Sequence, residues 1–72
     1  MNPEDKIEFT HRDRVMRAWQ NSMEMVRDYQ LYAKEMDDQP KVAKTFHEFA
    51  ETEAQHAACL RDILRSFQND AH

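Results

Sequence analysis

One face of this chain is marked by residues that recur at alternating steps of three and four, in two stretches separated by Pro40. The first stretch carries Val15, Trp19, Ser22, Val26, Tyr29, Ala33 and Met36. The second stretch carries Val42, Phe46, Phe49, Glu53, His56, Leu60, Ile63 and Phe67. Because an α-helix has about 3.6 residues per turn, this spacing keeps the members of each stretch on one face. The pattern therefore predicts an all-α protein built from two amphipathic helices that pack side by side.

Few residues can interrupt these helices, since the sequence contains no glycine and only two prolines. Thr10 followed by Asp13 resembles a capping box and predicts the start of the first helix. Pro40 cannot continue a preceding helix but suits the first turn of a new one. We therefore expect an antiparallel hairpin with helices over about 11–36 and 40–68.

The first ten residues precede this hairpin. Residues 1–10 form either an arm or a short helix, because Asn2 and Pro3 also resemble a helix start. Residues 1–5 do not resemble a signal peptide. The sequence has one cysteine, Cys59, and a free thiol is typical of a reducing compartment. We therefore expect a cytoplasmic protein.

Composition excludes several classes of function. The 72 residues form one domain at most, with 10 basic and 14 acidic residues and a net charge of −4, which argues against nucleic-acid binding. The absence of glycine excludes phosphate-binding loops, and the absence of a C-x-x-C motif excludes a rubredoxin-type iron site. No stretch approaches the roughly 20 apolar residues of a membrane span, so no membrane partner is expected.

The apolar stripe is too wide for two helices to bury. It includes large aromatic side chains such as Trp19, Tyr29, Phe46 and Phe49, and an exposed strip of this kind indicates an interface. Pairing of two hairpins into a four-helix bundle would cover it, and a two-fold dimer is the commonest homo-oligomer. We therefore predict a homodimer or a higher homo-oligomer. A bundle completed by a different protein is a weaker alternative.

Glu53 and His56 interrupt the apolar stripe of the second helix. A buried carboxylate needs a metal ion, a cation or a hydrogen-bond network. Residues at i and i+3 lie close enough to bind one ion, and imidazole nitrogen with carboxylate oxygen suits iron, manganese or zinc. The pair is therefore a candidate metal site. The alternative is a buried hydrogen bond in which His56 donates to Glu53 of a partner chain.

Three segments resemble a known family. The segment 40–46 reads P-x-[IV]-A-x-x-F, and the segment 53–57 reads E-x-x-H-A at the matching distance. Together with Tyr29-Gln30-Leu31-Tyr32-Ala33, they resemble the rubrerythrin-like branch of the ferritin-like superfamily. The resemblance covers about residues 18–66, one helical hairpin of that fold.

The resemblance implies a di-iron centre in which Glu53 and His56 are ligands. Short two-helix relatives, such as the encapsulated ferritins, are similar in building this site between chains. The further glutamate that the family carries on its first helix corresponds to Ser22 here. A shift of register would instead bring Glu24 inward, so Glu24 is a weaker candidate ligand.

The function that this resemblance implies is metal binding, with iron as the expected ion and manganese or zinc as alternatives. Iron oxidation or reduction of peroxide or oxygen would be the associated chemistry, with an external electron donor. Ser22 in place of a carboxylate puts that activity in doubt. The alternative is a non-enzymatic dimerisation module with a buried Glu53–His56 pair.

Overall fold

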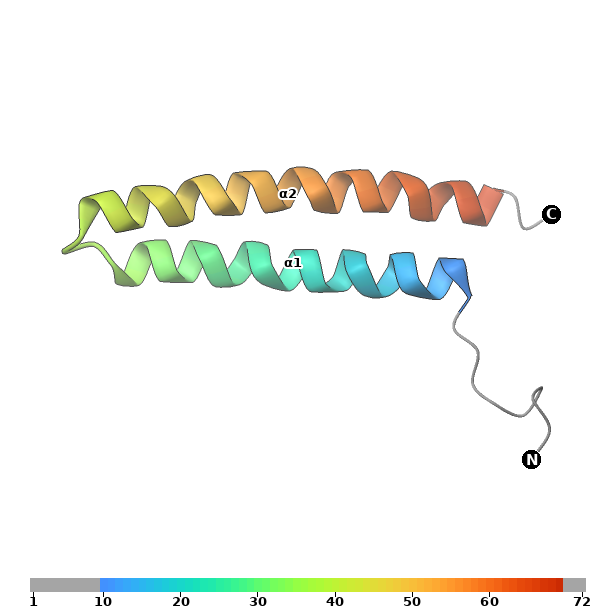
Figure 1. The fold of residues 1–72 in the computed structure, drawn as a ribbon, viewed down its shortest axis with the longest axis horizontal. Helices are drawn as coiled ribbons and strands as arrows, with labels where there is room; N and C mark the ends of the chain where they lie inside the picture. Colours follow the sequence, from blue (N-terminus) through green and yellow to red (C-terminus); the bar gives the residue numbers. More distant parts are fainter. Residues whose placement is uncertain (1–9, 70–72) are drawn as a thin grey trace, which may run out of the picture.

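The computed structural model describes residues 10–69, which form two α-helices, α1 from His11–Glu35 and α2 from Pro40–Asn69. They run antiparallel as a hairpin (Figure 1), which confirms the predicted all-α hairpin. Their bounds differ from the predicted ones by one residue, at the C-terminal end of each helix. The possible helix start at Asn2 and Pro3 lies outside the described residues.

Thr10 and Asp13 form the N-terminal cap of α1. The Asp13 N–H donates to Thr10 Oγ1 at 3.1 Å, and the Thr10 N–H donates to Asp13 Oδ2 at 3.1 Å. Both halves of the capping box are therefore present. Such a cap contributes about 1 kcal/mol to helix stability.

A short turn joins the two helices. The N–H of Met36 donates to the carbonyl of Tyr32 at 3.0 Å, and the N–H of Gln39 donates to the carbonyl of Met36 at 2.8 Å. The first backbone bond of α2 runs from Ala43 N–H to the Gln39 carbonyl. Pro40 occupies the first position of α2, where its missing N–H would have no partner inside the helix.

Small side chains form the contact between α1 and α2. The buried residues are Ser22, Ala33, Ala50, Ala57 and Leu64. On α2 the last three of these follow one another at intervals of seven residues, which gives a continuous contact line along the helix. Because alanine and serine are short, the two backbones can approach closely along this line.

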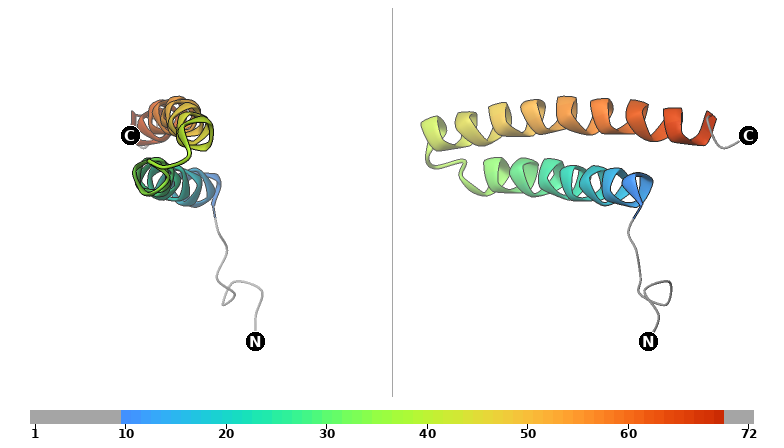
Figure 2. Two further views of the ribbon diagram at one scale, coloured as in Figure 1. Left: turned by 90° about the vertical axis from the view of Figure 1, so that its left-hand side faces the viewer. Right: turned by 45° about the vertical axis from the view of Figure 1, so that its right-hand side comes forward.

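A second line on α2 remains exposed in the hairpin. We call it the open face, and it consists of Val42, Phe49, His56 and Ile63. Val42 is 41% exposed, Phe49 48% and Ile63 40%. The sequence pattern had placed these residues at the centre of the stripe. In the hairpin, the residues that contact α1 are instead Ala50, Ala57 and Leu64, which we call the alanine line. The two helices lie side by side as a single layer, so this flank has no covering element within residues 10–69 (Figure 2).

A cluster of four aromatic rings fixes the register of the helices near the turn. The ring of Tyr29 stacks on Phe46 at 6.0 Å and meets the edge of Phe49 at 5.6 Å. Tyr32 contacts Phe46 at 5.4 Å. Because the helices are antiparallel, moving two turns back from Tyr29 reaches Ser22, while moving two turns forward from Phe46–Phe49 reaches the level of Glu53 and His56.

Candidate metal centre

Glu53 and His56 lie one turn apart on α2 and face each other. The distance between His56 Nδ1 and Glu53 Oε1 is 3.6 Å. A hydrogen bond between these atoms would measure about 2.7–3.2 Å. The two side chains are therefore close neighbours that are not hydrogen-bonded to each other.

The same distance is suitable for two atoms that bind one metal ion. Zinc binds histidine nitrogen and carboxylate oxygen at about 2.0–2.2 Å, which puts two such ligands roughly 3.4 Å apart at the tetrahedral angle. The observed 3.6 Å is close to this separation. The separation of these two atoms is therefore compatible with two ligands of one tetrahedral ion.

The hairpin covers the Glu53 and His56 side chains unequally. The side chain of Glu53 is 23% exposed, whereas that of His56 is 62% exposed. Glu53 lines a groove of about 280 Å³ together with Tyr29, Phe49 and Thr52. His56 belongs to the open face, with Phe49 about two turns before it and Ile63 about two turns after it. The hairpin thus covers most of Glu53, whereas His56 could be covered only by a second structural element.

The α1 residues expected near this site fall in different places. Ser22 is 7% exposed and lies at the level of Glu53 and His56. Glu24 is exposed and lines a separate groove with Trp19, Gln20, Met23 and Arg27. The register shift that would turn Glu24 toward Glu53 is not present in this hairpin.

A single described chain supplies an incomplete ligand set. Among residues 10–69, no group of three or more His, Cys, Asp or Glu side chains is placed to hold a metal ion. Cys59, one turn after His56, is exposed. Within residues 10–69 of one chain, Glu53 and His56 thus have no third side chain of these kinds beside them.

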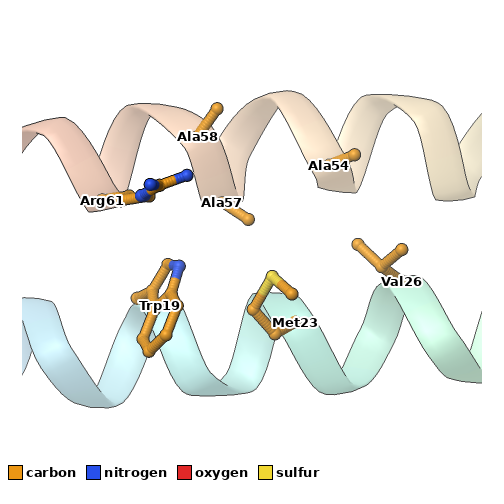
Figure 3. A pocket seen from close by; sticks show the side chains of 7 residues that line it. All are labelled: Trp19, Met23, Val26, Ala54, Ala57, Ala58 and Arg61. Atoms are coloured by element: carbon orange, nitrogen blue, oxygen red, sulfur yellow. The ribbon is translucent and has the colours of Figure 1, made fainter.

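The opposite flank of the hairpin has a groove of a different kind. It measures about 290 Å³ and is lined by Trp19, Met23, Val26, Ala54, Ala57, Ala58 and Arg61 (Figure 3). Its lining contains no carboxylate and no imidazole, so it is not a metal site. The three-and-four spacing did not reveal this groove, although Ala54, Ala57 and Ala58 are small residues across from Trp19, Met23 and Val26 and leave such a hollow (Figure 3). Neither described helix is both long and apolar enough to span a membrane.

One comparison with known proteins found a match for this chain. The family model described as Rubrerythrin matches residues 13–72. This range contains both helices, apart from the first two residues of α1. No curated protein and no solved structure matches the chain.

Proposed function

The chain belongs to the rubrerythrin family, a family of the ferritin-like superfamily, and from that premise we propose that it binds a metal ion between two copies of itself. Members of this family typically bind iron, so iron is the proposed ion. The observation that carries the proposal is the position of the Glu53–His56 pair. His56 is part of the open face, and Glu53 lies next to that face.

The open face supports pairing of two hairpins. Val42, Phe49 and Ile63 expose two-fifths or more of their surface, and such a strip costs free energy in water at about 25 cal/mol per Å². A second hairpin related by a two-fold axis would bury the same strip on both chains and complete a four-helix bundle. His56 lies in the middle of this strip, so pairing would also cover the more exposed donor.

Pairing would bring together two glutamates and two histidines. In ferritin-like proteins, two helices each provide a Glu-x-x-His motif to the metal centre, and Glu53 and His56 have this spacing. The carboxylates of Glu53 would offset the charge of the ion, and the His56 rings would supply neutral nitrogen ligands. Phe49 would keep water away from the carboxylate that it adjoins in the groove.

Iron would supply redox chemistry only where the protein ligands leave a coordination position open. Iron oxidation would then pass electrons from the iron to oxygen or peroxide, and repeated peroxide reduction would draw electrons from an external donor, since the chain contains no C-x-x-C motif.

A second function is favoured by one observation. Glu53 Oε1 and His56 Nδ1 lie 3.6 Å apart within one chain. A protonated His56 paired with Glu53 inside a dimer interface would fix the register of two hairpins without a metal ion. The chain would then be a non-enzymatic dimerisation module.

Elemental analysis separates the two functions. Protein purified without added metal or a metal-binding tag should contain iron, manganese or zinc. Glu53→Ala or His56→Ala should abolish binding of these metals while the helical circular-dichroism signal persists. Glu51→Ala and His47→Ala are matched controls, because both residues are exposed on α2 away from the open face, and they should leave the metal content unchanged. Absence of metal from wild-type protein supplied with near-millimolar iron or zinc would favour the dimerisation module.

A further inference from the structure

We infer that the site takes one metal ion per pair of chains and links the two hairpins, in place of a two-ion redox centre. This inference rests on the proposed function, since it concerns the same Glu53–His56 pair. It follows from which side chains α1 presents at the level of that pair.

The ligands that a two-ion ferritin-like centre needs from its other helices are missing from α1. Such a centre uses a glutamate from each of two helices in addition to the two Glu-x-x-His motifs. At this level α1 presents Ser22, which is buried and carries no charge. The nearest acids in sequence are Glu24 and Asp28. Glu24 is exposed and lines a groove formed by α1 residues alone. Asp28 directly precedes Tyr29, whose ring contacts Phe49 about two turns before His56.

The remaining acids of α1 are also occupied or distant. Asp13 accepts the N–H of Thr10 in the capping box, and Glu35 is the last residue of the helix. Within residues 10–69, the acids of α1 therefore do not fit a two-ion centre.

Charge favours one ion over two. The two Glu53 carboxylates of a dimer carry a charge of −2, which neutralises one divalent ion. Two divalent ions would leave a charge of +2 in an interior of low dielectric, and they would also repel each other with four times the energy of two unit charges. In a two-ion centre the additional carboxylates offset this repulsion, and Ser22 offers none.

The number of ligands favours a closed site. Two glutamates and two histidines complete a four-coordinate ion, and sites closed by four protein ligands are structural, whereas catalytic sites keep a position open. The 3.6 Å spacing of Nδ1 and Oε1 agrees with a tetrahedral arrangement. Because each chain holds only half of the ligands, binding of the ion stabilises the dimer and not the single hairpin.

The first experiment counts ions and measures dimerisation. Tag-free wild-type protein is stripped with a chelator, then titrated with zinc and, without oxygen, with ferrous iron. Equilibrium dialysis should give one ion per two chains. Sedimentation equilibrium should show dimerisation tightened about 100-fold when free metal is 100 times its dissociation constant.

A matched pair of variants tests the role of Ser22. Ser22→Glu should raise the number of ferrous ions toward two per dimer, because it adds one carboxylate per chain at the level of the site. Asn21→Glu adds the same charge at the next residue, which is exposed, and should leave the count at one. Circular dichroism establishes that each variant is folded, and the wild-type count decides the question if Ser22→Glu is not.

The outcomes separate this inference from the proposed function. Two ions per wild-type dimer would overturn the inference and leave the proposed metal site standing. Equal dimerisation with and without metal would overturn the link between hairpins. Failure of wild-type protein to bind any ion would overturn the proposed function, and the inference with it.

Discussion

Truncation of Phe49 provides a direct test of the open face. In the hairpin this ring contacts Tyr29 at 5.6 Å and Phe46 at 6.3 Å, yet 48% of the residue remains exposed. If a partner chain covers the exposed half, Phe49→Ala should weaken dimerisation as well as the hairpin.

The exposed fraction sets the size of this effect. A phenylalanine buries roughly 200 Å², so the exposed half corresponds to about 2.4 kcal/mol at 25 cal/mol per Å². Each dimer loses this contribution twice when both chains carry the substitution. The dimer dissociation constant should therefore rise by up to roughly three-thousandfold.

Sedimentation equilibrium over a range of concentrations measures this constant, with circular dichroism at each concentration to separate dissociation from unfolding. Leu31→Ala is the matched control, because Leu31 is 51% exposed. Leu31 lies two residues after Tyr29, so its side chain points about 200° away from the one that contacts α2. If both substitutions weaken the dimer equally, or if Phe49→Ala leaves the dimerisation constant unchanged, then the partner chain does not cover the open face at Phe49.

Three further predictions concern stability and metal binding. Ala57→Leu should destabilise the hairpin by about 1–3 kcal/mol, because Ala57 is 3% exposed at the helix contact and a larger side chain would force the helices apart; an unchanged denaturation midpoint in urea would contradict the close contact. Thr10→Ala should cost about 1 kcal/mol through loss of the capping box, seen as a lower Tm together with faster amide exchange in the first turn of α1. Metal should raise the Tm of wild type but not that of His56→Ala, whereas His47→Ala should keep the rise; equal responses of the two variants would show that His56 is not a ligand.

The helix bounds could be predicted because local chemistry determines them. The reciprocal bonds of Thr10 and Asp13 are made within one turn, and Pro40 restricts the backbone before it. Neither depends on tertiary contacts. These local signals were therefore sufficient to locate the start of each helix, whereas each C-terminal end differs from its predicted position by one residue.

The division of the apolar stripe could not be predicted in the same way. Residues such as Ala50 and Phe49 are adjacent on α2, and both satisfy the three-and-four spacing. Which of them meets α1 depends on how closely the backbones approach, and that is a property of the packed pair of helices. The structure selects the alanine line and leaves Phe49 and His56 on the open face. For the same reason, sequence spacing identified the Glu53–His56 pair but did not show that the two side chains are covered unequally.

The position of the aromatic cluster has a consequence for how the hairpin folds. Tyr29, Tyr32, Phe46 and Phe49 all lie near the turn, so their contacts close only a short loop and cost little entropy. Helix pairing should begin there and extend toward Thr10, which makes folding fast because the early contacts are local. Substitutions in the cluster should then slow folding, whereas substitutions near Trp19 should mainly speed unfolding. The groove beside Glu53 is lined by Tyr29 and Phe49 of this cluster, so it should form as the aromatic end of the hairpin closes.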